Sequence, residues 1–119
     1  MIAPRLLLRA DASHRLGSGH ALRLAALAEA AIDAGGAATL VVGGDPAPTL
    51  AMFAARDLPA LAMATDSGGP ADAAATIAVA RARGVDAVVI DGPAFAAPYV
   101  AALAAAGLRT VAVDDLGLA

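Results

Sequence analysis

Short, unbroken apolar runs alternate with helical patterns along the whole chain, and this alternation limits its fold more than any other feature. Strands are expected at 5–9, 37–42, 58–64, 87–90 and 108–113, and helices at 20–34, 49–55, 71–83 and 97–106. Runs such as Val88-Val89-Ile90 lack polar alternation, so helices should cover both faces of the sheet. The pattern predicts an α/β fold: a Rossmann-like, three-layer, doubly wound parallel sheet of five strands in the order 3-2-1-4-5.

Length and composition narrow the classes of protein. The 119 residues suffice for one domain with its own core, and the absence of cysteine excludes disulfides and thiolate metal sites. We therefore expect a cytoplasmic protein. A net charge of -3 without any basic cluster argues against nucleic-acid binding. The hydrophobic content of 60% comes largely from alanine, and the longest uncharged stretch, 92–108, contains proline and glycine, so we expect no membrane span.

Acidic residues gather where ligands bind in such a fold. The predicted strand order places the topological switch between the first and fourth strands, at their carboxyl ends. Six of the eleven acidic residues follow expected strand ends: Asp11, Asp45, Asp66, Asp91, Asp114 and Asp115. Aspartate also favours turns and helix caps, which is the simpler interpretation of Asp45 and Asp66. Asp91, Asp114 and Asp115 could converge on Mg²⁺, but capping and pairing with arginine are favoured, and neither a metal nor a cofactor is expected.

The stretch 9–23, RADASHRLGSGHALR, joins the first strand to the first helix and holds both histidines. Gly17, Ser18 and Gly19 precede the expected helix, whose free N–H groups and dipole favour a phosphate. A dinucleotide fingerprint would need a third glycine where Leu22 stands, and its glycines would follow the strand directly, not about eight residues later. An NAD-binding domain, with Asp45 near the ribose, is therefore the weaker alternative.

Three side chains of this stretch could carry chemistry. His20 falls in the first helical turn, where the dipole favours the neutral imidazole that a general base needs, although a histidine can also simply cap or pack there. His14 is expected to be solvated. Arg23, one turn after His20, could reach a phosphate, pair with an aspartate or lie on the surface. Arg9 leaves a buried strand and needs a partner, which Asp11 or Asp91 could supply.

These motifs resemble a known family. R-A-D-A-S (9–13), G-S-G-H (17–20) and A-L-R-L-A-A-L-A (21–28) are similar to the amino-terminal signature of the UDP-sugar hydrolases of the pseudaminic-acid pathway. Related glycosyltransferase-like proteins of spore-coat polysaccharide biosynthesis share that signature. V-V-I-D (88–91) and V-A-V-D-D-L (111–116) follow in the family's order, so the resemblance extends over essentially the whole chain.

The resemblance implies a two-domain glycosyltransferase-B architecture in which residues 1–119 are the amino-terminal domain and the second, nucleotide-binding domain is absent. It implies cleavage of a UDP-sugar to UDP and free sugar, with His20 as general base. Hydrolysis and transfer both stay open, as does the sugar. The expected substrate-binding residues are Gly17, Ser18 and Gly19 at the diphosphate, and Arg9, Asp11, Ser13, Arg23 and Asp91 around the sugar.

One departure from the family concerns a tyrosine. The family's fourth strand usually ends Asp-x-Tyr, but Pro93 stands at that position here and Tyr99 comes later in the chain. The hydroxyl is then missing or supplied from elsewhere. This departure keeps a second hypothesis open, a non-catalytic α/β domain that acts by associating with a partner domain.

Overall fold

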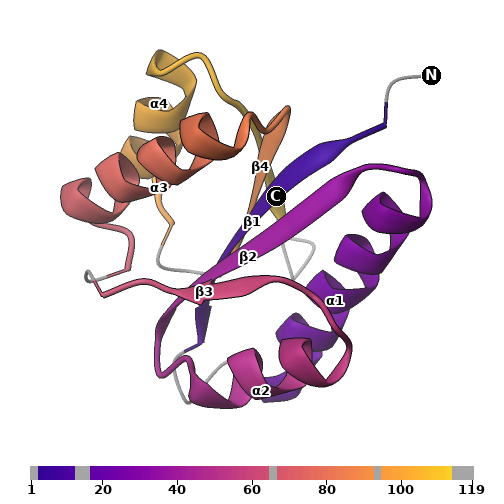
Figure 1. Cartoon of the computed structure of the whole chain (residues 1–119). Coiled ribbons are helices and arrows are strands. Elements are labelled where there is room, and N and C mark those ends of the chain that lie inside the picture. Colours follow the sequence, from indigo (N-terminus) through magenta and orange to yellow (C-terminus); the bar gives the residue numbers. More distant parts are fainter. Residues whose placement is uncertain (1–2, 13–16, 65–66, 93–94, 114–119) are drawn as a thin grey trace.

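The computed structural model describes residues 3–12, 17–64, 67–92 and 95–113, with the backbone alone at 12 and 17–20. Its strands form one sheet in the order β3-β2-β1-β4-β5, and every neighbouring pair is parallel (Figure 1). The predicted fold class and strand order are confirmed. The strands are β1 (Arg5–Ala12), β2 (Ala37–Gly44), β3 (Ala60–Ala62), β4 (Ala87–Asp91) and β5 (Arg109–Val113).

Helices cover both faces of this sheet. One pair lies against one face and the other pair against the opposite face, which gives three layers (Figure 1). The first pair is α1 (Gly17–Asp33) and α2 (Ala47–Ala55), and the second is α3 (Pro70–Arg83) and α4 (Ala97–Ala105). Among the described residues, no helix has the length and apolar character needed to cross a bilayer.

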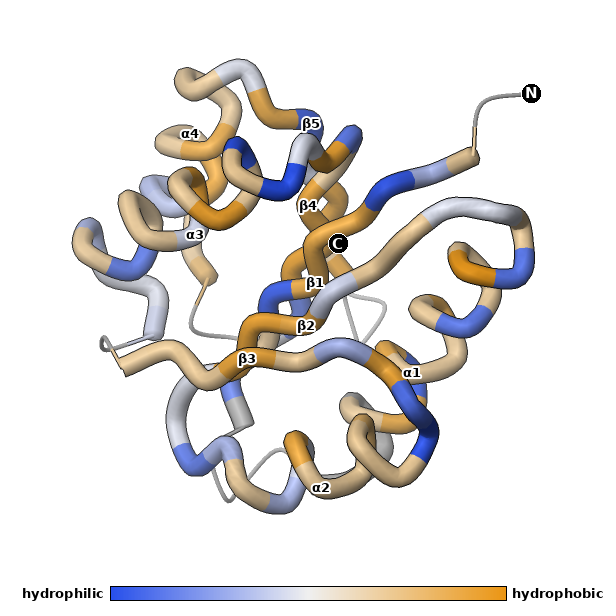
Figure 2. Tube along the Cα trace, in the orientation of Figure 1, coloured by the Kyte–Doolittle hydropathy of each residue, from blue (hydrophilic) through white to orange (hydrophobic). Residues whose placement is uncertain are grey.

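The sheet divides the core in two because successive strand residues point to opposite faces. Leu8, Val42 and Val89 pack under α1 and α2 with Leu24 and Phe53. On the opposite side, below α3 and α4, the apolar cluster consists of Leu7, Val41, Ala73, Ala80, Val88, Ile90, Phe95, Tyr99 and Leu103. Figure 2 shows the resulting band of apolar residues along the central strands. The same alternation decides which face each polar strand residue reaches.

Two boundaries near the predicted site differ from the expectation. β1 continues to Ala12 because it pairs with β2 along its whole length, Arg5 with Ala37 through Ala12 with Gly44. α1 begins at Gly17 and not at residue 20. The glycines therefore form the first helical turn, where the N–H groups lack intrahelical acceptors, instead of the loop before it.

The edge strand β3 is shorter than expected, with only Ala60–Ala62 instead of 58–64. Pro59 precedes it and cannot donate to a ladder, which fits its predicted position at the sheet edge. The other helices and strands agree with the expected ranges to within a residue or two.

Candidate functional site

The candidate site lies at the carboxyl ends of β1 and β4. These strands are neighbours, with Ala10 opposite Asp91, while the chain leaves β1 for α1 on one face and reaches β4 from α3 on the other. Their carboxyl ends are thus the topological switch point, where open α/β sheets bind ligands. Asp11 and Asp91 both lie there, at or near the last residue of their strands.

Arg23 and Asp91 form an ion pair on the α1 side of this edge. Nη2 of Arg23 lies 3.0 and 2.9 Å from the two carboxylate oxygens of Asp91. The Asp91 side chain is fully buried, whereas that of Arg23 is 38% exposed. The pairing with an aspartate that was one of the options for Arg23 is confirmed. The pair holds the partly exposed guanidinium of Arg23 at this edge of the sheet.

Arg9 is paired on the opposite face, and its expected partners were wrong. Its guanidinium binds Asp72 through two parallel hydrogen bonds, Nε to Oδ1 at 3.0 Å and Nη2 to Oδ2 at 2.7 Å. Both side chains are fully buried. Arg9 follows Leu7 in alternation and points toward α3, whereas Asp91 follows Val89 and points toward α1. The sheet itself therefore separates Arg9 from Asp91.

Among the described residues, the hydroxyl of Ser67 links Asp11 to this network. The Ser67 hydroxyl donates to Oδ1 of Asp11 at 3.1 Å, and Nη2 of Arg9 lies 3.5 Å from the same hydroxyl. Further Arg9 donors go to the carbonyls of Ala10 and Val41. Asp11 is half-buried, so Ser67 holds a partly exposed carboxylate at the strand end.

Asp72 is the centre of the network. Besides Arg9, it accepts hydrogen bonds from the Gly68 amide at 2.7 Å, from Thr76 at 3.0 Å and from the Tyr99 hydroxyl at 3.1 Å. The hydroxyl oxygens of Thr76 and Tyr99 also lie 2.8 Å apart, so either hydroxyl can donate to the other in place of Asp72. Tyr99 is only 2% exposed, so its hydroxyl supports the buried network and does not reach the surface.

The network has fixed charges at neutral pH. Burial alone would raise the pKa of Asp72, but the hydrogen bonds and charge of Arg9, together with the Gly68 amide and Thr76, hold it below its ordinary value. Burial, with the negative charge of Asp72 adding to it, raises the pKa of Tyr99 to about 12. Asp72 therefore stays ionised and Tyr99 stays protonated, which suits a structural support and not an acid–base pair.

Phe95 and Gly43 also lie against this network. The Arg9 guanidinium lies 5.0 Å from the centre of the Phe95 ring, and Phe95 lies 4.9 Å from Tyr99. A Cβ on Gly43 would come within 2.7 Å of the Ser67 hydroxyl and 3.0 Å of Nη2 of Arg9. The backbone of β2 can therefore lie against the Arg9 guanidinium only because residue 43 has no side chain.

The structure brings together some predicted site residues and leaves others undescribed. Arg23 and Asp91 are paired, and Asp11 lies nearby, while Asp45 is exposed after β2. Gly17, Ser18, Gly19 and His20 form the first turn of α1, but what the Ser18 and His20 side chains contact lies outside the described residues. Six further residues lie outside the described ranges altogether: Ser13, His14, Asp66, Pro93, Asp114 and Asp115.

Ser67, Asp72 and Thr76 were missed by sequence reasoning. A signal was present: Asp72, Thr76 and Ala80 are spaced by four residues, which places two polar groups on the buried stripe of α3. A polar residue on such a stripe needs a buried partner, and Arg9 needed one as well. As for metals, the described residues contain no group of three potential ligands.

Comparison with known proteins gives a likeness of fold. No family model matches the chain, and no curated protein does. A glycosyltransferase from Rickettsia africae ESF-5 superposes with a TM-score of 0.65 at 14% identity, over 93% of this chain and 30% of that one. UDP-GlcNAc 2-epimerase from Neisseria meningitidis, solved with UDP-GlcNAc bound, superposes with a TM-score of 0.61 at 9% identity, over 96% and 34%.

These two structures confirm the Rossmann-like fold expected for one domain of a glycosyltransferase-B enzyme. At such low identities the likeness concerns the fold alone. The chain spans about a third of the length of either structure.

Proposed function

We propose that this chain is a nucleotide-sugar-binding domain of an enzyme that hydrolyses a UDP-sugar or transfers its sugar. The observation that carries the proposal is that the start of a helix and a partly exposed arginine lie at one point of the sheet. The glycine-containing first turn of α1 and the Arg23–Asp91 pair both lie at the carboxyl edge beside β1 and β4. One of the two similar structures described above was solved with a UDP-sugar bound.

The diphosphate of the substrate suits this edge chemically. The first N–H groups of a helix have no intrahelical acceptors, and the aligned peptide dipoles add positive potential there. Glycine at positions 17 and 19 lets a ligand approach the backbone closely. Arg23 follows within two turns of the same helix, and its guanidinium, paired with the buried Asp91, would lie beside the diphosphate.

His20 is the proposed general base. It lies in the first turn of α1, next to the proposed diphosphate position. It would take a proton from a water molecule, or from an acceptor hydroxyl in a transferase. The oxygen so activated forms the new bond to the sugar while the bond to the diphosphate breaks and UDP leaves with the electron pair. Asp11, held by Ser67, would bind a sugar hydroxyl.

The proposal includes a second domain and a biosynthetic context. In a glycosyltransferase-B arrangement the substrate lies in a cleft between two domains, and this chain would form one wall. That it spans about a third of the two similar structures supports this. The motifs at 9–28 and 88–91 favour an enzyme of nonulosonate (pseudaminic acid) or other surface-polysaccharide biosynthesis.

The proposal is tested by measuring the release of UDP from UDP-sugars, first with the chain alone and then with a second domain supplied. His20→Ala should lower the turnover of the completed enzyme by roughly a hundredfold or more, the usual contribution of a general base. His14→Ala is the matched control, since it removes the chain's other histidine from the same segment. Unchanged turnover in His20→Ala, or an equal loss in both variants, would contradict the assignment.

A non-catalytic domain that works by association is the second candidate. It is favoured by the outer strand β5, which within the described residues pairs with β4 alone, and where Val111 is 49% exposed. Such an edge invites pairing with another chain or domain. Failure of every tested UDP-sugar to bind, together with concentration-dependent association, would favour this function over the enzymatic one.

A further inference from the structure

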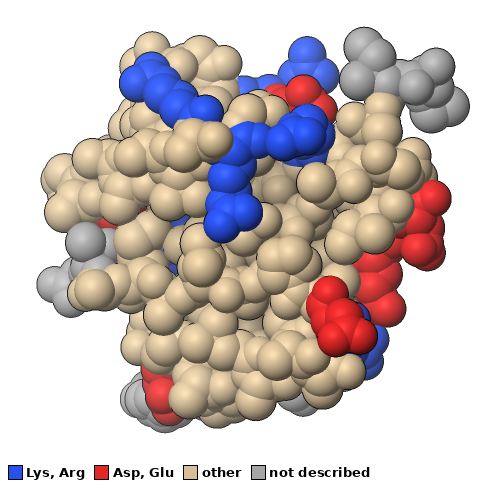
Figure 3. All heavy atoms as spheres, viewed as in Figure 1, with Lys and Arg blue, Asp and Glu red and all other residues tan. Residues whose placement is uncertain are grey.

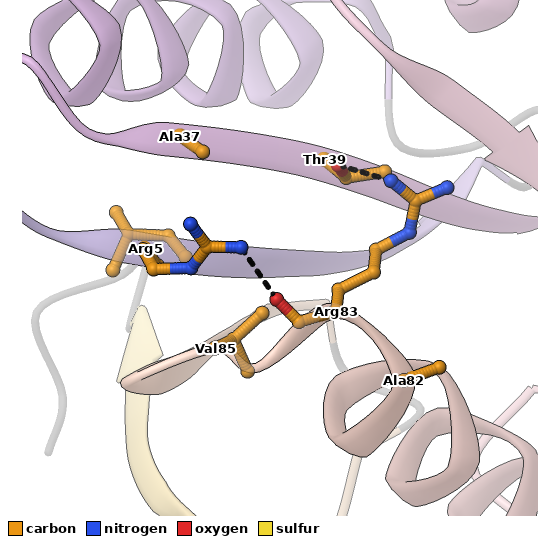
Figure 4. A pocket seen from close by; sticks show the side chains of 7 residues that line it. Arg5, Ala37, Thr39, Ala82, Arg83 and Val85 are labelled. Atoms are coloured by element: carbon orange, nitrogen blue, oxygen red, sulfur yellow. Dashed lines mark hydrogen bonds between the residues drawn. The ribbon is translucent and has the colours of Figure 1, made fainter.

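We propose a second anion site at the amino-terminal edge of the sheet, which takes inorganic phosphate or another multivalent oxyanion. A pocket of about 170 Å³ opens there, between the first halves of β1 and β2 and the end of α3 (Figure 4). Its polar wall consists of Arg5, Thr39 and Arg83, and its apolar wall includes Leu6, Ala37 and Val85. It lies at the opposite end of the strands from the site beside Arg23 and Asp91, so it does not depend on the proposed function.

Two guanidinium groups are fixed at this pocket. Arg83 extends from the last residue of α3 across to β2, where its Nη1 donates to the Thr39 hydroxyl at 3.3 Å (Figure 4). Arg5 donates from Nη2 to the Arg83 carbonyl at 2.8 Å and from Nε to the Gly84 carbonyl at 3.2 Å. A guanidinium has five N–H donors. Within the described part of the chain, Arg83 uses one of these donors and Arg5 uses two.

Two arginines give this pocket positive charge. In the described ranges, neither Arg5 nor Arg83 has a carboxylate within ion-pair distance. The neighbouring Asp86 accepts the backbone N–H of Arg5 at 2.9 Å instead. Arg81, in the last turn of α3, and Arg109, the first residue of β5, add positive charge at the same end of the sheet.

The amino-terminal end of the sheet holds half of the chain's eight basic residues, namely Arg5, Arg81, Arg83 and Arg109. In Figure 3 most of the basic atoms of the visible face gather over this part of the molecule, with an acidic group among them. Neighbouring positive charges repel each other, and a multivalent anion between Arg5 and Arg83 would relieve that repulsion.

Helix capping explains only part of this arrangement. Arginines near a helix end commonly bind its last carbonyls and oppose its dipole, and Arg5 does this for α3. Arg83 does not, because its guanidinium turns away from the helix toward Thr39 on β2. Arg5 binds the carbonyls of Arg83 and Gly84, and the Arg83 guanidinium itself is directed to β2, where its remaining N–H donors could meet a ligand.

Size and lining indicate the class of ligand. The volume of about 170 Å³ is many times what one water molecule needs, and it would accommodate one tetrahedral oxyanion with bound water. Guanidinium donors match two oxygens of a phosphate at once. Thr39, which is 7% exposed, accepts from Arg83 and would donate its own O–H to a third oxygen.

Titration of the 119-residue chain with inorganic phosphate, at ionic strength held constant with chloride, tests the site by NMR. Saturable shifts are expected at the amides of residue 39 and residues 83–85, with a dissociation constant on the order of 1 mM. Arg83→Gln should weaken binding about tenfold, as expected for the loss of a charged hydrogen-bond donor. Thr39→Val, which keeps both charges, should also weaken it. Arg81→Gln is the matched control, because it removes the same charge from the same helical turn outside the pocket lining.

Three results would overturn the proposal. The first is the absence of saturable shifts in the wild-type chain. The second is an equal loss of affinity in Arg83→Gln and Arg81→Gln, which would show diffuse attraction to the basic end. The third is unchanged affinity in both Arg83→Gln and Thr39→Val, with circular dichroism showing that both variants fold.

Discussion

At the scale of single residues, the buried pair of Arg9 and Asp72 determines how the carboxyl edge is held. A buried charge is expensive unless it is paired and hydrogen-bonded. The pair satisfies this with two parallel bonds and with further donors from Gly68, Thr76 and Tyr99. These partners come from the segment before α3, from α3 and from α4, so one carboxylate ties three parts of the chain to β1.

Asp72→Ala should therefore destabilise the chain strongly. It leaves the Arg9 guanidinium buried without its counter-charge, and breaking a buried pair in this way costs about 3–5 kcal/mol. Urea unfolding followed by circular dichroism measures the loss. Glu29→Ala is the matched control, because it breaks the pair of Glu29 with Arg56, whose side chains are 45% and 41% exposed. That change should cost less than about 1 kcal/mol, and equal costs would contradict the role given to Asp72.

The lowered pKa of Asp72 predicts a loss of stability in acid. The fold favours the ionised form, so the contribution is fully present above the ordinary pKa of 3.8 and is lost as the pH falls through the lower value of the folded state. The free energy of unfolding should decline with falling pH below that point. Asp72→Asn, which cannot ionise, should decline less steeply, and equal slopes would show that other carboxylates cause the effect.

Tyr99 predicts the opposite behaviour in alkali. Its pKa is raised from 10.0 to about 12, so the fold favours the protonated phenol. That contribution is present below pH 10 and is lost as the pH rises toward 12. Because Tyr99 is the chain's single tyrosine and tryptophan is absent, phenolate absorbance reports this group alone. Absorbance should stay low at about pH 11 while circular dichroism shows a folded chain, and a midpoint near the ordinary value would contradict the burial of the hydroxyl.

The sequence allowed part of this site to be predicted. That Arg9 needs a buried partner follows from its place at the end of an apolar run, and Arg23 was rightly given an aspartate as one option. The partner of Arg9 could not be chosen, because it depends on which face of β1 the side chain leaves. Asp72 lies 63 residues away in the sequence, and only the register of the strands and the docking of α3 bring it there.

At the scale of elements, the end of β2 shows how a glycine makes room for the network. Gly43 pairs with Asp11 across the ladder and is buried, in a strand that also contains Gly44. Its lack of a side chain allows the Arg9 guanidinium and the Ser67 hydroxyl to lie against the backbone. A glycine in a strand usually weakens it, so this contact is what the residue contributes in return.

Gly43→Ala should disturb the network and destabilise the chain by about 1–3 kcal/mol, the usual effect of overpacking. The added methyl would lie 2.7 Å from the Ser67 hydroxyl and 3.0 Å from Nη2 of Arg9. Gly84→Ala is the comparison, since a Cβ there meets nothing within 4 Å and only the positive φ of 61° opposes it. Chemical shifts of the Arg9 guanidinium should move in Gly43→Ala and stay in place in Gly84→Ala. Movement in neither variant would contradict the close packing.

Element boundaries were less predictable than element types. Every expected strand and helix exists, because apolar runs and glycine or proline stops indicate them locally. The extra residues of β1 form a strand because β2 offers them a ladder, a long-range effect that no local pattern contains. The start of α1 at Gly17 likewise goes against the low helix propensity of glycine.

At the scale of the whole molecule, the order of strands follows from general rules. Right-handed crossovers and helices on both faces leave few arrangements for five parallel strands, and the predicted order 3-2-1-4-5 is the one found. The same order leaves β3 and β5 at the two edges. β3 is protected by its shortness and by Pro59. β5 has five residues without proline, and its Val111 and Ala112 are exposed.

The exposed edge at β5 should make the chain associate as its concentration rises, either with itself or, in a longer protein, with a neighbouring segment. Val111→Lys should reduce this association, because a charge on an edge strand opposes pairing. Since Val111 is 49% exposed, the variant should keep its stability to within about 0.5 kcal/mol. Sedimentation equilibrium over a range of concentrations measures the effect. Leu22→Lys is the matched control, an apolar side chain of similar exposure, 46%, that lies on α1 away from the edge. A wild-type chain that stays monomeric throughout, or an equal effect of both substitutions, would show that β5 is not an interface.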